Sequence, residues 1–101
     1  MEINKLQREL TIWLNERGLN SKTINEWIQL SILMEEVGET SSVLTKGKGN
    51  LGEEIADVII SAVCLGISKQ INVQSEIKKK LKELQGRKSY NVDGHIRITH
   101  V

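Results

Sequence analysis

Residues 51–69 read LGEEIADVIISAVCLGISK, a stretch whose apolar side chains cover nearly every direction around a helical axis. A helix that is hydrophobic on most sides must be buried on most sides. The chain has 101 residues and can hardly surround such a helix by itself. We therefore expect a homo-oligomer, in which a second copy of the chain completes the core.

The sequence contains no proline, so glycines are its main helix-breaking residues. They divide the rest of the chain into helical segments. Apolar residues recur at spacings of three and four over residues 3–17 and again over residues 72–85. This spacing predicts one amphipathic helix in each range. Gly18 follows the first range at the place where a left-handed residue commonly ends a helix.

Two N-terminal capping patterns mark the starts of the central helices. Thr23 and Glu26 are three residues apart, as in a capping box, and predict a helix from there to about Leu44. Asn50 and Glu53 have the same spacing and predict the start of the apolar helix described above. The expected fold is an all-α, four-helix bundle that is completed by homo-oligomerisation.

The C-terminal tail has a different pattern. Ser89 to Val92 and His95 to Ile98 flank an Asp-Gly pair, which predicts a short hairpin with a tight turn. The sequence shows no internal repeat and no low-complexity segment, so we expect one domain over residues 1–101.

The composition narrows the class of protein. The formal net charge is +1, so no overall field draws the chain to a membrane or to a nucleic-acid polymer. Cys64 is the sole cysteine, which excludes an intramolecular disulfide and a cysteine-based zinc site and fits a reducing compartment. The apolar-rich run over residues 55–67 is too short to span a bilayer. We expect a cytoplasmic protein without a membrane partner.

Acidic residues concentrate in the two central helices. Glu36 and Glu39 are three residues apart and share a helix face with Glu35, and Glu54 and Asp57 form a second such pair. Paired glutamates on a helix are usually a solvated face. Two pairs within apolar helices instead favour a buried site, where repelling carboxylates need a cation between them.

The chemistry of these ligands indicates which cation to expect. The cluster offers only carboxylate oxygens, and such oxygen sites select magnesium, manganese or calcium over zinc or copper. The chain carries no EF-hand calcium loop. We therefore expect Mg²⁺, with Mn²⁺ as a substitute that the same oxygens accept.

The acidic pattern also resembles a known family. EEVGE at residues 35–39, followed after fourteen residues by EIAD at 54–57, is similar to the EExxE…ExxD signature of the MazG-like, all-α nucleotide pyrophosphohydrolases. The likeness continues into residues 33–34, 58–60, 13–19 and 86–96, so it covers most of the chain.

This resemblance implies a helical bundle that assembles as a homo-dimer or homo-tetramer. It also implies Mg²⁺-dependent hydrolysis of a nucleoside triphosphate to monophosphate and pyrophosphate. A deoxynucleotide and a modified nucleotide are the candidate substrates. Glu36, Glu39, Glu54 and Asp57 match the family's metal ligands. Glu35 matches the first glutamate of the signature and is expected to support the site or to act as base for the attacking water.

A basic segment follows in the last helix. Lys79 and Arg87 fit the lysine and arginine that family members place near its end, and Lys88 adjoins them. These side chains are candidates for contact with the substrate phosphates. A solvated helix face is the simpler alternative. Gly86 stands where the family commonly has an asparagine, which weakens the match at that point.

A non-enzymatic function is the main competing interpretation. The same acids would then hold a structural ion in a helical oligomerisation or regulatory module. The two tryptophans, Trp13 and Trp27, lie on apolar helix stripes and are expected in the core rather than against a nucleobase. Turnover of nucleotides is the observation that separates an enzyme from a module.

Overall fold

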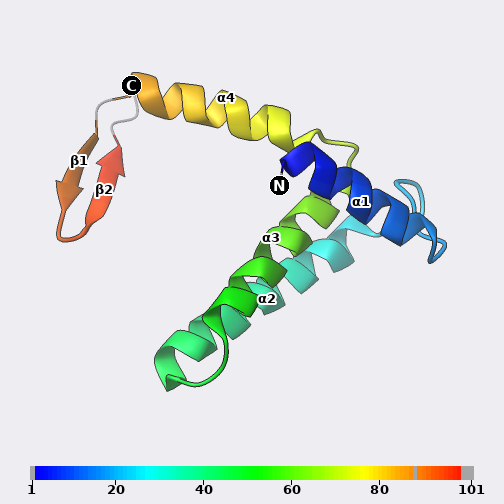
Figure 1. Cartoon of the computed structure of the whole chain (residues 1–101), viewed down its shortest axis with the longest axis horizontal. Helices are drawn as coiled ribbons and strands as arrows, with labels where there is room; N and C mark the ends of the chain where they lie inside the picture. Colours follow the sequence, from blue (N-terminus) through cyan, green and yellow to red (C-terminus); the bar gives the residue numbers. More distant parts are fainter. Residues whose placement is uncertain (1, 88, 99–101) are drawn as a thin grey trace.

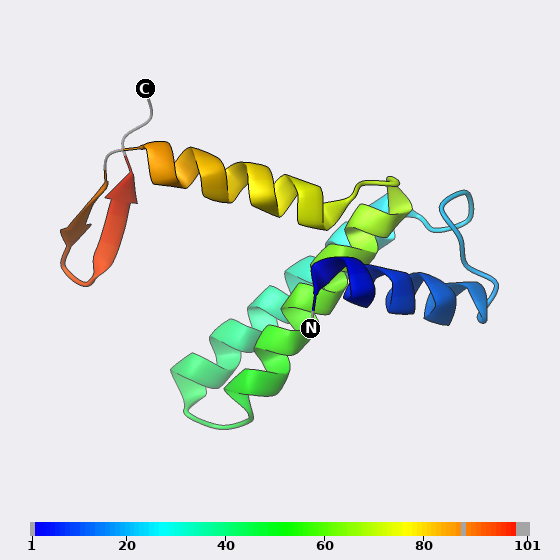
Figure 2. The same cartoon turned by 45° about the horizontal axis from the view of Figure 1, so that its top comes forward.

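Two long helices form the body of the chain, which a computed structural model describes over residues 2–87 and 89–98 (Figure 1). α2 (Glu26–Lys46) and α3 (Leu51–Ser68) run antiparallel, side by side. α1 (Ile3–Asn15) packs across α3, and α4 (Val73–Gly86) leads away from the end of α3 and packs against α1. Figure 2 shows the same arrangement after a 45° turn. The predicted four helices are present, and the fold is all-α.

The start of α2 differs from the predicted capping box. Asn25 is the cap, and its Oδ1 accepts hydrogen bonds from the backbone N–H groups of Trp27 at 2.9 Å and Ile28 at 3.2 Å. The assignment of the cap to Thr23 was therefore wrong. Its hydroxyl instead accepts from the backbone N–H of Asn20 at 2.9 Å, in the turn before the helix. The short Asn25 side chain lies nearer the first free N–H groups.

The starts of α3 and α4 follow the sequence pattern more closely. Asn50 Oδ1 accepts a hydrogen bond from the Glu53 backbone N–H at 3.1 Å, which confirms the predicted cap of α3. Asn72 caps α4 in the same way, through the backbone N–H of Ser75 at 2.9 Å. Each cap satisfies a backbone donor that the helix itself leaves unpaired.

The core lies where α1 crosses the C-terminal half of α3. Its buried apolar side chains are Leu14, Ile24, Val63, Cys64 and Ile67. Cys64 is thus a small buried hydrophobe, as expected. Apolar side chains in the N-terminal half of α3, such as Ile55 and Ile59, are exposed, so the core occupies one end of the helical pair.

Both tryptophans lie outside this core, contrary to the expectation from their helix stripes. Trp27 is 72% exposed and Trp13 is 49% exposed. Trp27 lies at the start of α2, where it lines a shallow open pocket with Leu65 and Lys69 at the end of α3. The guanidinium carbon of Arg17 lies over the Trp13 ring, 4.0 Å from the ring centroid, in a cation–π contact.

The predicted C-terminal hairpin is confirmed. β1 (Ser89–Val92) pairs antiparallel with β2 (His95–Ile98). Asp93 and Gly94 both have positive φ, 49° and 85°, as a two-residue turn of this kind requires. The hairpin lies beyond the end of α4, apart from α2 and α3 in both views (Figures 1 and 2). None of the described helices has the length and apolarity needed to cross a membrane.

Candidate metal centre

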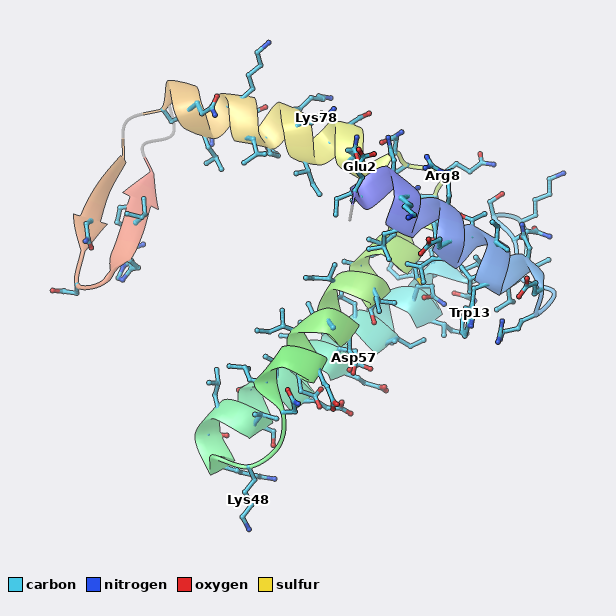
Figure 3. The ribbon with its side chains drawn as sticks, in the orientation of Figure 1. Glu2, Arg8, Trp13, Lys48, Asp57 and Lys78 are labelled. Carbon is cyan, nitrogen blue, oxygen red and sulfur yellow. The ribbon has the colours of Figure 1, made fainter. Side chains whose placement is uncertain are left out.

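The packing of α2 against α3 brings acids from the two signatures together. Glu36 on α2 and Glu54 and Asp57 on α3 each offer one carboxylate oxygen, and these three oxygens lie within 4.8 Å of one another. We call these three residues the acidic trio. Figure 3 shows Asp57 amid carboxylate oxygens beside the middle of the helical pair. The spacing suits ligands that share one cation.

Two oxygens in the trio are buried without compensation. Among the described residues, Glu36 Oε2 and Glu54 Oε2 are enclosed and have no hydrogen-bond partner. Asp57 is exposed, so the trio opens to solvent on one side. A buried carboxylate oxygen without a donor is costly, and a bound cation removes that cost. An all-oxygen donor set fits Mg²⁺ or Mn²⁺.

The pKa values of the buried acids also favour a bound cation. Burial raises the pKa of the Glu36 carboxyl, and repulsion from Glu39, Asp57 and Glu54 raises it further. Burial also raises the pKa of Glu54, with added repulsion from Glu39 and Asp57 and, more weakly, from Glu53. Negative charge is therefore in excess here, and a divalent cation would favour the ionised form of both carboxyls.

The other two predicted acids lie at the edge of the trio. Glu39 is exposed, but its charge acts on both Glu36 and Glu54. Glu35 is also exposed and does not belong to the trio. The structure thus brings together three of the four residues predicted as metal ligands, with the fourth close by. The roles of Glu35 and Glu39 stay predictions.

The basic residues lie elsewhere. Lys79 Nζ is 3.6 Å from Glu76 Oε2, and an Arg87 guanidinium nitrogen is 3.4 Å from Glu83 Oε2, so both take part in ion pairs within α4. Lys88 lies outside the described residues. α4 diverges from α2 and α3, and Figure 3 shows its Lys78 far from Asp57. Within one chain, Lys79 and Arg87 are not brought to the acidic trio.

A second concave region was not predicted from the sequence. A pocket of about 390 Å³ lies between α1, the loop after it and the end of α3, and its lining is rich in amide side chains. They come from positions 7 to 72 and form no motif. Only the packing of α1 on α3 brings them together, so no local sequence signal was available.

Fold and site together define an all-α protein with a cluster of carboxylates between two antiparallel helices. Residues 26–91 match the MazG nucleotide pyrophosphohydrolase domain. The chain therefore belongs to the MazG nucleotide pyrophosphohydrolase family, and it is a hydrolase that acts on nucleotides.

Among solved structures, the chain is similar to the cyanophage S-2L MazG-like pyrophosphohydrolase bound to dGDP and three catalytic Mn²⁺ ions per active site. The two share 24% sequence identity over 99% of each chain, with a TM-score of 0.71. At this identity the likeness is one of fold. No match was found among curated protein sequences.

Proposed function

We propose that this protein hydrolyses a nucleoside triphosphate to a nucleoside monophosphate and pyrophosphate with Mg²⁺ held by the acidic trio. The observation that carries this proposal is the pair of buried oxygens without donors, Glu36 Oε2 and Glu54 Oε2, in a cluster whose oxygens lie within 4.8 Å. Membership of the MazG family supports the reaction class. The dGDP in the cyanophage structure supports a deoxynucleotide as substrate.

Each acid has a role that follows from its position. When bound, a divalent cation neutralises phosphate charge and lowers the pKa of a coordinated water. Glu36, Glu54 and Asp57 would hold it, with Glu39 as a further ligand from the edge of the trio. Exposed Glu35 would accept the proton of the attacking water as that water is added across the α–β phosphoanhydride bond.

The same residues offer enough oxygen ligands for more than one ion. Five carboxylates within two helices are enough to hold more than one ion. The three Mn²⁺ ions per site in the cyanophage protein support this count and support Mn²⁺ as an alternative to Mg²⁺. A two-ion arrangement would stabilise both the attacking and the leaving oxygen.

We infer that the working form is a homo-dimer or homo-tetramer. The leaving pyrophosphate needs positive charge beyond the metal. Lys79 lies on α4 and Arg87 directly follows it, and α4 leads away from the helices that carry the trio (Figure 1). The flank of α2 and α3 also carries an apolar pocket of about 400 Å³ that includes exposed Val37, Leu44, Ile55 and Ile59. A second copy that covers this flank would bury apolar surface and could present its own α4 to the trio.

Pyrophosphate release is the direct test of the proposed activity. Purified full-length protein with Mg²⁺ and a panel of ribo- and deoxynucleoside triphosphates should release pyrophosphate and monophosphate in equal amounts. Asp57→Asn and Glu39→Gln should each lower kcat/KM at least about 100-fold, because metal ligands matter more than the outer residues that orient them. Far-ultraviolet circular dichroism should show that the variants stay helical.

Glu53→Gln is the matched control. Glu53 adjoins Glu54 on α3 but does not belong to the trio, so its loss should leave turnover close to that of the unaltered chain. Full activity in Asp57→Asn would refute the site. If no nucleotide is turned over while Mg²⁺ still binds, the non-catalytic oligomerisation module becomes the better interpretation.

A further inference from the structure

α4 is held to the rest of the chain at its N-terminal end. It packs against α1 there, and its far end leads away from the other helices in both views (Figures 1 and 2). A helix rises about 1.5 Å per residue, so turning α4 by about 10° at its start moves Lys79 by about 2 Å and Arg87 by about 4 Å. A misplacement of about 1 Å can already lower a rate about 100-fold. The direction of α4 therefore decides where its basic side chains can act.

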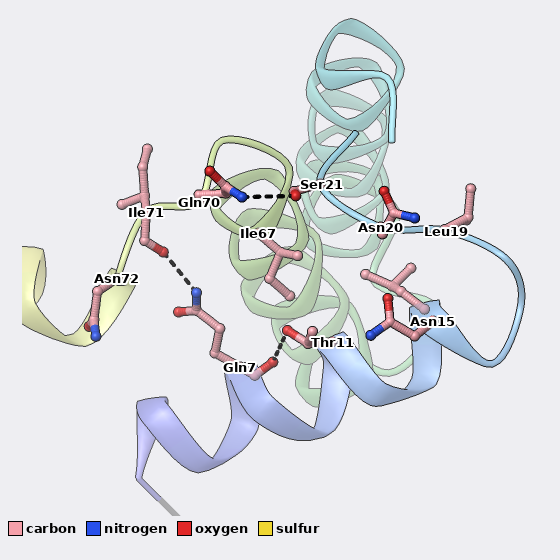
Figure 4. A pocket seen from close by; sticks show the side chains of 11 residues that line it. Gln7, Thr11, Asn15, Leu19, Asn20, Ser21, Ile67, Gln70, Ile71 and Asn72 are labelled. Atoms are coloured by element: carbon pink, nitrogen blue, oxygen red, sulfur yellow. Dashed lines mark hydrogen bonds between the residues drawn. The ribbon is translucent and has the colours of Figure 1, made fainter. Parts of the chain in front are cut away.

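Gln7 of α1 attaches to the start of α4 through both ends of its side-chain amide. Gln7 Nε2 donates to the backbone carbonyl of Ile71 at 2.7 Å, as Figure 4 shows, and Gln7 Oε1 accepts from the backbone N–H of Val73 at 3.2 Å. Ile71 lies in the linker after α3, and Val73 is the first residue of α4. Two hydrogen bonds from one planar group prevent rotation about either bond, so they fix a direction as well as a position.

A further contact between the same two helices supports this attachment. The backbone N–H of Asn4 in α1 donates to Gln74 Oε1 in α4 at 2.9 Å. The N–H groups of Asn4 and Val73 both lie in the first turn of a helix, where the helix itself supplies no acceptor. Each of the two helices therefore satisfies a free backbone donor of the other.

The apolar contact at the start of α4 does not fix a direction. A Cβ at Gly66 would lie 2.6 Å from Val73 Cγ2, so Val73 packs closely over the glycine backbone of α3. Apolar contact is non-directional and allows α4 to turn about this point. Hydrogen bonds weaken steeply when they bend, so the amide of Gln7 selects one direction among those that the apolar contact allows.

We infer that Gln7 is a positioning residue that sets the direction of α4 and thereby the place where Lys79 and Arg87 meet substrate phosphates. Its effect on turnover rests on the proposed function, in which a second copy presents its α4 to the acidic trio. Its effect on the direction of α4 does not depend on any activity and is measured separately.

Spin labels measure the direction of α4 in the full chain. Nitroxides attached at Ser31→Cys of α2 and Gln85→Cys of α4 occupy exposed positions, whereas Cys64 is buried. An excess of unlabelled chain restricts the measured distances to those within one copy. Gln7→Leu removes both hydrogen bonds and should shift or broaden the distance distribution by about 3 Å, the displacement of Gln85 in a turn of about 10°. Glu9→Leu, at an exposed position of α1, is the control.

Turnover then tests whether this direction matters to the reaction. Gln7→Leu should lower kcat/KM for pyrophosphate release at least about tenfold. In a Lys79→Gln background the same change should cost less, because a misdirected α4 cannot displace a contact that is already lost. A residue that only stabilises the fold would give two losses that add.

Gln7→Glu separates direction from stability and replaces Gln7→Leu if that variant does not fold. Its carboxylate still accepts from the Val73 N–H and adds negative charge at the N-terminus of α4, so its Tm should stay near that of the unaltered chain. It cannot donate to Ile71 O, so the distances should still shift and kcat/KM should still fall. Unchanged distances in both Gln7 variants, or losses that add to that of Lys79→Gln, would overturn the positioning role.

The two measurements distinguish this role from the proposed hydrolysis. If no nucleotide is hydrolysed but Gln7→Leu shifts the distances, the proposed function fails and Gln7 still sets the direction of α4. If hydrolysis is equally fast in the unaltered chain and in both Gln7 variants, the proposed function stands and the positioning role is refuted.

Discussion

Glu36 of α2 and Glu54 of α3 each bury one carboxylate oxygen where no donor in the described chain reaches it, and with Asp57 they offer oxygens within 4.8 Å of one another. α2 and α3, which pack against each other along their length, therefore meet at a place where their carboxylates repel one another. A bound cation would turn this repulsion into a link between α2 and α3. Stability, ion binding and pH are thus expected to be coupled.

The metal-free protein should become more stable as the pH falls through the folded-state pKa values of Glu36 and Glu54 toward about 4.5. The pKa values of Glu36 and Glu54 are raised above the ordinary 4.5 in the folded chain, so the folded state binds more protons than the unfolded state. Their stabilising contribution is complete below about 4.5 and is lost as the pH rises through the folded pKa values. Thermal unfolding with a chelator present measures the slope.

A Glu36→Gln, Glu54→Gln double variant is the comparison for this slope. The stability of this variant should depend less on pH than that of the unaltered chain. Without metal at about pH 8 the variant should also be the more stable of the two, because neutral amides do not repel one another. Identical slopes for the two proteins would show that the trio does not govern the pH dependence.

Magnesium should reverse this behaviour. Binding requires ionised carboxylates, so Mg²⁺ or Mn²⁺ should release protons and raise Tm, with affinity increasing as the pH rises. Isothermal titration in two buffers of different ionisation enthalpy counts the protons. Asp57→Asn should weaken binding by about 10–100-fold or more, while Glu53→Gln should leave it nearly unchanged. Equal affinities in the two variants would remove Asp57 from the site.

Gly66→Ala should destabilise the fold. A Cβ at this position would lie 2.6 Å from Cγ2 of Val73, the first residue of α4. Alanine gains about 1 kcal/mol of helix propensity, but overpacking costs about 1–3 kcal/mol and a β-branched neighbour cannot easily turn aside. Urea unfolding should show a net loss in the free energy of unfolding. In the Gly66→Ala, Val73→Ala double variant this loss should be smaller than the sum of the losses in the two single variants.

Asn25→Ala should cost about 1 kcal/mol of stability, because it removes the acceptor for two backbone N–H groups at the start of α2. Asn25→Asp keeps an oxygen at the cap and adds negative charge at the helix N-terminus, so it should match or exceed the unaltered chain. Denaturant midpoints measure both. Equal losses in Ala and Asp would mean that the side chain contributes through something other than the cap.

Leu44→Glu should dissociate the inferred oligomer with little effect on the helices. Leu44 is 66% exposed in one chain and lines the apolar pocket of α2 and α3, so a charge there is tolerated by the monomer but not in a buried interface. Sedimentation velocity reports the mass. The adjacent exposed Thr45→Glu is the control, and a Leu44→Glu protein of unchanged oligomeric mass would place the interface elsewhere.

Most of the fold could be predicted from local pattern. Gly47 ends α2 in the left-handed region, and Asn50 caps α3 as its spacing indicated. The misplaced cap at Thr23 arose because Asn25, two residues later, competes for the same N–H groups and lies nearer to them. The exposure of Trp27 was not predictable, because a helix stripe shows that a face needs a partner but not whether the same chain supplies it.

The sequence by itself determined four helices, the terminal hairpin and five candidate acids in the two central helices, because capping, periodicity and i, i+3 spacing are local properties of the chain. Tertiary structure decided the rest. Packing of α2 on α3 selected Glu36, Glu54 and Asp57 as the trio, left Glu35 outside it, and directed α4 with Lys79 away. It also assembled the amide pocket from distant positions, because which faces meet depends on contacts between elements that no local spacing encodes.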